Sequence, residues 1–233
     1  MTLDVTNIGL FAQEIDDQDL EDLAMFPLPD GVLFPHTTIR LHVFERRYRM
    51  LVEDLLAAQA PFSVASIAAD GRTDRLGQPH VHGVAGLGAI ISSQELEGGC
   101  YNLLVRGVGR VRILEEHEVR TPYRRVRAAL LEDRIADVRR ADLLLKTIQN
   151  CLFNIETNNS DVVDFVMEAF TSVDTHGAAA DILAAVVFGD TLARQRALGE
   201  VDVNKRLEAI LARLVELISK GTREKIAQAD LVN

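Results

Sequence analysis

The sequence predicts an α+β protein in which a small β-barrel with one early helix is followed by an all-α helical bundle. From residue 24 to about residue 131, short apolar segments alternate with polar residues at a period of two, which is typical of half-buried strands. Beyond residue 136, apolar residues recur every three or four positions, which is typical of amphipathic helices. Aromatic residues make up only 5% of the chain and Trp is absent, so Leu, Val, Ile and Ala must supply the core.

An acidic arm over residues 1–23 is the first predicted segment. Residues 1–30 contain eight acidic side chains and no basic one, and their apolar residues show only weak periodicity. This composition is more typical of a solvated arm than of a core element. We therefore predict three parts: the arm, a β-barrel part over residues 24–135 and a helical part over residues 136–233.

The barrel part opens with a strand, a turn and a second strand, because short apolar pieces between residues 24 and 44 alternate with Pro and Gly. The Pro-Asp-Gly run at residues 29–31 favours a turn, and Pro35 cannot lie inside a hydrogen-bonded ladder because it has no N–H group. Residues 46–59 then show one apolar face at helical spacing and end before Pro61, which predicts a helix.

Four further strands are predicted, over residues 62–68, 81–91, 101–114 and 124–131. Gly98 and Gly99 favour a hairpin between the second and the third of these. Gly107 and Gly109 interrupt the third strand, where we expect a bulge or a sharp bend. Several short, consecutive strands and one early helix are typical of a small closed or nearly closed barrel.

Four helices are predicted in the helical part, over residues 137–151, 161–171, 178–188 and 202–219. Each repeats apolar residues at intervals of three and four. The last has the clearest stripe, formed by Val203, Leu207, Ile210, Leu211, Leu214 and Ile218. Asp202 directly precedes this stripe and is suited to be the N-cap.

The charge distribution argues against a general nucleic-acid binder. The net charge is −10, whereas such proteins are basic overall or carry one strongly basic face. Only residues 101–140 are basic, with ten arginines against six acids. We therefore expect that nucleic acid is not a partner.

The sequence contains few signals for cellular targeting or for disulfide formation. The N-terminal sequence has no basic region followed by a continuous apolar one, so it does not predict a signal peptide. The longest apolar run, residues 182–188, is far too short to span a membrane. Cys100 and Cys151 are the only cysteines and do not form a disulfide framework. We expect a cytoplasmic protein that does not bind membranes.

Several segments, taken in order, resemble the N-terminal substrate-binding domain of Lon proteases. Residues 26–56 (FPLPDGVLFPHTTIRLHVFERRYRMLVEDLL) are similar to the opening of that domain, with its Pro-Leu strand, Phe-Pro turn, second strand and helix. The FERRYR run is most similar to stand-alone bacterial Lon-domain proteins and to RING-finger proteins that carry this domain, although Arg46 replaces their usual Pro. Residues 104–113 (LVRGVGRVRI) resemble a later strand of the family. Residues 180–183 (ADIL) and 203–207 (VNKRL) resemble its closing helices, where an Ala-Asp and an Arg-Leu pair recur.

The resemblance implies a PUA-like barrel followed by helices, and a non-catalytic module that binds exposed or unfolded segments of client or partner proteins. We expect the peptide-binding groove at the seam between the barrel and the helices, with a contribution from the turn at Leu33, Phe34 and Pro35. Lon proteases continue into an ATPase and a peptidase. This chain contains neither a G-x-x-x-x-G-K-[ST] phosphate loop nor a G-x-S-x-G nucleophile turn. We therefore expect a stand-alone domain that is not an enzyme, binds no ATP and needs no cofactor.

Two alternative functions are an RNA-binding PUA-like barrel and, with less support, a peptidase. Other PUA-like barrels bind RNA, and residues 106–127 are rich in arginine. Acidic neighbours dilute that positive field and favour a solvated strand face instead, namely Glu115, Glu116 and Glu118. The sequence lacks the motifs of a peptidase, and it shows no recognisable base that would activate Cys100 as a nucleophile.

A metal site is the remaining possibility for the histidines. His80 and His82 would share one face of a strand, as two zinc ligands do. Zinc needs at least a third ligand, which His36, His42 or Cys100 could supply only if the fold brings one of them close to the pair. We interpret the pair as surface histidines and expect no bound metal.

Two other patterns favour structural roles. Gly83, Gly86 and Gly88 are spaced GxxGxG inside a strand, whereas a dinucleotide fingerprint needs GxGxxG between a strand and a helix, so we expect close strand packing. Glu45 and Arg47 begin the early helix. A Glu there stabilises the helix N-terminus, and the Arg could join the helix to the barrel.

Overall fold

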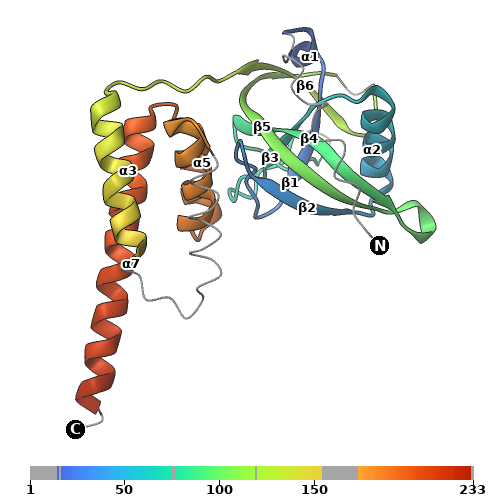
Figure 1. Cartoon of the computed structure of the whole chain (residues 1–233). Coiled ribbons are helices and arrows are strands. Elements are labelled where there is room, and N and C mark those ends of the chain that lie inside the picture. Colours follow the sequence, from blue (N-terminus) through green and yellow to red (C-terminus); the bar gives the residue numbers. More distant parts are fainter. Residues whose placement is uncertain (1–14, 16, 75–76, 119, 154–172, 232–233) are drawn as a thin grey trace. The chain divides into compact units, whose positions relative to one another are not determined.

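The computed structural model describes residue 15 and residues 17–74, 77–118, 120–153 and 173–231. The chain divides into two compact units, Met1–Glu132 and Asp133–Asn233. Most of the predicted acidic arm and the whole predicted helix at 161–171 lie outside the described residues. In the described part, strands occupy the first unit and helices the second, which confirms the α+β class (Figure 1).

A six-stranded mixed sheet forms the first unit (Figure 1). Its strands are β1 (Leu23–Leu28), β2 (Thr38–Val43), β3 (Phe62–Ser66), β4 (Val84–Glu95), β5 (Tyr101–Glu116) and β6 (Arg124–Leu130). Their order is β2-β5-β4-β3-β1-β6, and β5 also pairs with β6. The β1–β3 pair is parallel, and the other pairs are antiparallel. The hydrogen-bonded pairing therefore forms a closed circuit of five strands, β5-β4-β3-β1-β6, that returns to β5.

The length of β5 makes this circuit possible. One edge of β5 pairs with β4 along most of its length. On the other edge, the first part of β5 pairs with β2 and the last part with β6. The register shifts where Leu87 faces Gly109 and Gly88 faces Gly107, so Val108 has no partner on β4. This bulge confirms the interruption predicted from the two glycines of β5.

The β4–β5 hairpin also follows the prediction. Its turn is a short 3-10 helix, η1 (Glu97–Gly99). Gly98 has a φ of 80° and Gly99 a φ of 74°, which glycine adopts at no steric cost.

Two helices accompany the sheet. In α2 (Arg46–Ala58), the buried residues are Tyr48, Leu51, Val52 and Leu55, and Gln59 ends the helix in the left-handed conformation. The short α1 (Asp17–Glu21) lies in the predicted acidic arm. Its Leu20 is buried and packs in a cluster with Leu23, so the end of that arm is part of the core. A five-residue helix is too short to show an apolar period in the sequence.

The second unit contains α3 (Val138–Phe153), α5 (His176–Val187), α6 (Thr191–Gly199) and α7 (Val203–Leu231). Fully buried side chains on three of these helices form its core, namely Ala141, Ile148, Leu183, Leu207 and Ile210. The sequence did not predict α6, because TLARQRALG has no apolar stripe. Asp190 caps this helix by accepting a hydrogen bond from the Ala193 N–H group at 2.8 Å. None of the helices in the described part of the chain combines the length and the apolar character that a membrane crossing needs.

Candidate functional site

The turn predicted to bind peptides is buried. Leu33 and Phe34 are both 0% exposed, and Pro35 is also buried. The turn ends at His36, which has a φ of 63°, and Thr37 Oγ1 donates a hydrogen bond to the Phe34 carbonyl at 2.8 Å. The three side chains are therefore buried within the sheet unit, and their contribution to peptide binding stays a prediction.

Glycines on β4 and β5 let this turn lie directly on the sheet. A Cβ atom at Gly86 would be 2.2 Å from the Leu33 carbonyl oxygen, and one at Gly107 would be 2.0 Å from that of Phe34. Gly107 also exchanges backbone hydrogen bonds with the turn, accepting from His36 at 2.9 Å and donating to Thr37 at 2.8 Å. The close packing predicted for the GxxGxG run is confirmed at Gly86, where only glycine fits.

A groove of about 220 Å³, lined by both apolar and polar side chains, opens between the end of α2 and the middle of β4. Its lining is Leu55, Leu56, Gln59, Ala60, Ile90, Ile91, Ser92 and Ser93. The sequence placed Leu56 and Ile91 on apolar faces. In the structure Leu56 is 37% exposed and Ile91 is partly exposed, so both are accessible. Sequence periodicity could not predict this, because it does not reveal where a neighbouring strand ends.

The groove follows an unpaired length of strand. β3 pairs with β4 only at Gly86, Leu87 and Gly88. Beyond Gly88, β4 continues to Glu95 with β5 on one edge, and no described strand pairs with its other edge. The N–H and C=O groups on that edge border the groove. A groove with leucine and isoleucine side chains beside a free strand edge can accept an extended polypeptide.

The arginines of β6 are neutralised by acidic side chains. Arg124 donates to both carboxylate oxygens of Glu116 at 2.7 and 2.6 Å. Arg125 pairs with Asp22 at 2.7 Å. Among the other arginines, Arg110 on β5 is only 2% exposed, which corrects the expectation that it lies on a solvated face. The arginine-rich segment therefore presents less free positive charge than its composition suggests.

A polar cluster connects the start of α2 with the sheet unit. Arg47 Nη1 donates to Gln78 Oε1 at 2.8 Å, so this arginine joins the helix to the loop between β3 and β4. Tyr123 donates its hydroxyl hydrogen to Asp54 Oδ2 at 2.6 Å. Burial raises the pKa of Tyr123, and the hydrogen bond and negative charge of Asp54 raise it further. These side chains hold the helix in place.

The histidines that were considered as zinc ligands contact polar side chains of the protein. His80 Nδ1 lies 2.8 Å from Asp70 Oδ2, and His42 Nδ1 lies 2.8 Å from Asn102 Oδ1. The Arg72 N–H and the His80 ring lower the pKa of the Asp70 carboxyl group. Within the described ranges, no group of three or more His, Cys, Asp or Glu side chains could hold a metal ion.

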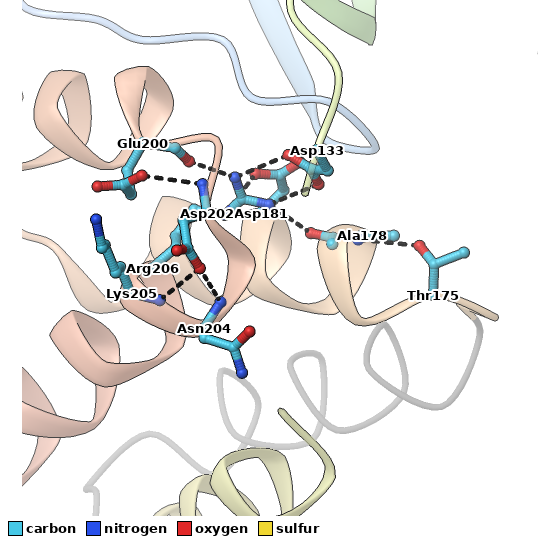
Figure 2. A network of polar contacts seen from close by, with 10 residues as sticks. Asp133, Thr175, Ala178, Asp181, Glu200, Asp202, Asn204, Lys205 and Arg206 are labelled. Carbon is cyan, nitrogen blue, oxygen red and sulfur yellow. Dashed lines mark hydrogen bonds and ion pairs between the residues drawn. The ribbon is translucent and has the colours of Figure 1, made fainter. Parts of the chain in front are cut away.

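A buried ion network holds the helical unit together (Figure 2). Arg206 on α7 is 0% exposed and donates to both carboxylate oxygens of Asp133 at 3.0 and 2.8 Å. Its Nε lies 3.4 Å from Asp181 Oδ1 on α5. It also donates to the carbonyl oxygens of Glu200 and Gly177. The sequence marked Asp181 and Arg206 as members of recurring pairs without indicating that they meet.

Known proteins similar to this chain agree on one family. The profile of the "ATP-dependent protease La (LON) substrate-binding domain" matches residues 22–216. The chain is 23% identical over 205 residues to the Lon protease of Syntrophomonas wolfei, covering 88% of this chain and 24% of that protein. It is 25% identical over 201 residues to the Lon protease of Azorhizobium caulinodans, covering 86% of this chain and 23% of that protein. The chain thus spans about a quarter of the length of these relatives.

Solved structures show the same fold. The N-terminal domain of Mycobacterium avium complex Lon protease superposes with a TM-score of 0.64 at 15% identity, covering 84% of this chain and 98% of that one. A Lon N-terminal domain protein from Xanthomonas campestris superposes with a TM-score of 0.55 at 25% identity, covering 82% and 97%. Because the family profile matches well over half of its residues, the chain belongs to the LON substrate-binding domain family.

Proposed function

We propose that this chain is a non-catalytic module that binds exposed or unfolded segments of client or partner proteins in the groove between α2 and β4. The observation that carries the proposal is a groove in which leucine and isoleucine side chains lie beside polar ones, next to a strand edge that no described strand occupies. Leu56, Ile90 and Ile91 supply apolar contacts, while Gln59 and Ser92 supply a polar rim. Apolar walls with a few polar groups are typical of binding sites.

Membership of a substrate-binding family supports a role in recognition. The relatives named Lon protease are about four times longer, and this chain covers only a fraction of each. In our proposal this chain contributes recognition, in the cytoplasm, and neither ATP hydrolysis nor peptide cleavage. The closed pairing circuit of the first unit supports its interpretation as a PUA-like barrel, and the helices of the second as a bundle.

RNA binding has less support. The ion pairs of Arg124 and Arg125 with Glu116 and Asp22 reduce the charge available to phosphates. Nucleic-acid affinity depends on the number of phosphates that free basic side chains neutralise.

A matched pair of variants tests the groove. Leu56→Lys places a charge in its apolar wall, whereas Leu114→Lys makes the same change at a leucine of β5 that is 47% exposed and does not line the groove. We expect Leu56→Lys to weaken binding of a fluorescent, leucine-rich extended peptide roughly tenfold, or about 1.4 kcal/mol. Leu114→Lys should leave the affinity unchanged. Equal affinities of both variants for the peptide would place binding elsewhere.

A further inference from the structure

We propose that the groove takes its peptide as an additional strand, antiparallel to β4, and that it prefers segments with a basic residue near their N-terminal end. This inference rests on the proposed function and names the class of segment that the groove selects. It has three supports: the free backbone edge of β4, the direction of the neighbouring strand β3, and two glutamates on α2 and β4 just beyond the lining of the groove.

The free edge makes strand addition possible. Alternate residues of a strand direct their N–H and C=O groups to opposite edges. Between Ala89 and Glu95, β4 pairs with β5 alone among the described strands. The register with β5 shifts between Ile90 and Ser92, so this alternation is regular from Ser92 to Glu95, where half of the backbone groups face away from β5. An added strand would hydrogen-bond with them and place every second side chain against Leu56 and Ile91.

The direction follows from β3. Phe62 is the first residue of β3 and faces Gly88, and the two strands are antiparallel. Just before Phe62 the chain leaves this edge, because Ala60 and Pro61 connect β3 back to α2. A peptide that continues the β3 ladder along β4 therefore runs in the direction of β3. Its N-terminal end then lies beside Glu95.

The charge at that end is negative. Glu53 lies one helical turn before Leu56 on α2, and Glu95 is the last residue of β4, where it faces Tyr101 on β5. Both glutamates are exposed, and neither forms an ion pair with a described residue. Their common neighbour is Tyr101.

The negative charges of both glutamates affect the pKa of Tyr101. Its pKa is raised by burial first and then by the negative charges of Glu95 and Glu53. Arg49 acts in the opposite direction on this pKa, but its guanidinium donates to the Gly98 carbonyl. A lysine or arginine at the N-terminal end of the added strand would lie beside Glu95, which faces Tyr101 across the β4–β5 pair.

The probes are acetylated and amidated octapeptides of alternating leucine and threonine, with one lysine either at the first or at the last position. We expect the peptide with N-terminal lysine to bind about two- to fivefold more tightly, the range for exposed ion pairs. The double variant Glu53→Gln/Glu95→Gln should remove this difference. Its control, Glu118→Gln/Glu132→Gln, makes the same change of net charge at exposed residues that do not line the groove and should retain the difference.

Backbone methylation tests the added strand itself. Two versions of the N-terminal lysine peptide carry N-methyl groups on alternate amides, one on the odd and one on the even positions. We expect one version to lose roughly tenfold or more in affinity, because it lacks the donors to β4, and the other to bind nearly as well as the parent peptide.

Each contrary outcome has a distinct meaning. Equal binding of both methylated versions, with the parent peptide bound, overturns strand addition and leaves the proposed function standing. Tighter binding of the peptide with C-terminal lysine overturns the antiparallel direction. If no leucine-threonine peptide binds, both the proposed function and this inference fail.

Discussion

Arg206 and Asp181 form an ion pair inside the helical unit, where Nε of the arginine lies 3.4 Å from Oδ1 of the aspartate and both side chains are buried. Arg206 lies near the start of α7 and Asp181 in the middle of α5. The same guanidinium binds both oxygens of Asp133, the first residue of the helical unit. A single buried cation therefore joins two helices to the segment that precedes α3 (Figure 2).

Loss of this cation should destabilise the helical unit strongly. Arg206→Met leaves the buried carboxylate of Asp181 without the guanidinium, and removing one partner of a buried ion pair costs about 3–5 kcal/mol. Arg213→Met on the same helix is the control, because Arg213 pairs with Glu216 at the surface and exposed pairs contribute about 1 kcal/mol or less. Urea unfolding followed by far-UV circular dichroism measures both. Similar losses in the free energy of unfolding of the two variants would contradict a stabilising role of the buried ion network.

The contact between the buried turn and the sheet predicts that alanine destabilises the protein at Gly107 but not at Gly83. Gly107→Ala would place Cβ 2.0 Å from the Phe34 carbonyl oxygen, so the turn must move away from β5. We expect a loss of about 1–3 kcal/mol in the free energy of unfolding, the usual cost of overpacking. At Gly83, a Cβ atom would meet nothing within 4 Å, so Gly83→Ala should be nearly neutral. A neutral Gly107→Ala in chemical denaturation would show that the turn does not pack in this way.

Alkaline pH should destabilise the sheet unit, which contains all three tyrosines, Tyr48, Tyr101 and Tyr123. Burial is the first cause that raises each pKa above the ordinary value of 10.0. The folded state thus favours the neutral phenol. Its contribution to stability is present below pH about 10 and is lost as the pH rises through the folded-state pKa values. Phenolate absorbance should titrate above free tyrosine and coincide with loss of strand signal. Titration at the free value in a folded protein would contradict this.

The purified chain should neither hydrolyse ATP nor cleave a casein-like substrate, because it contains neither motif that such activity needs. The candidate nucleophiles Ser63 and Ser66 are buried on β3, and Ser63 donates to the Ala24 carbonyl at 3.1 Å. Phosphate release and fluorogenic casein assays measure the two activities. Turnover that co-purifies with the protein and disappears in Ser63→Ala, Ser66→Ala or Cys100→Ala would show that it is an enzyme.

The sequence predicted those features that depend on local periodicity. The bulge in β5, the β4–β5 hairpin and α2 all follow from glycine positions or from an apolar face. The burial of the Leu33-Phe34-Pro35 turn could not be predicted, because an apolar turn looks the same in the sequence whether it is exposed or buried. The contact glycines Gly86 and Gly107 were the available signal, since close backbone approach requires glycine.

The groove could be predicted only in part. Leu56 and Ile91 were assigned to apolar faces, but their accessibility depends on β3 beginning only at Phe62. The register between distant strands determines that start, and no local pattern encodes it. Likewise, the meeting of Asp181 with Arg206 depends on how α5 packs against α7.

Salt dependence of binding to peptide and to RNA tests the central claim most directly. A labelled leucine-rich peptide and a labelled single-stranded RNA are titrated with the wild-type protein at low and at near-physiological salt. We predict micromolar peptide binding, about −8 kcal/mol, that survives added salt because it depends on buried apolar area. RNA binding should be weak at both conditions, because the chain has a net charge of −10. Tight RNA binding that collapses with salt, together with no peptide binding at either condition, would contradict the account and favour an RNA-binding protein.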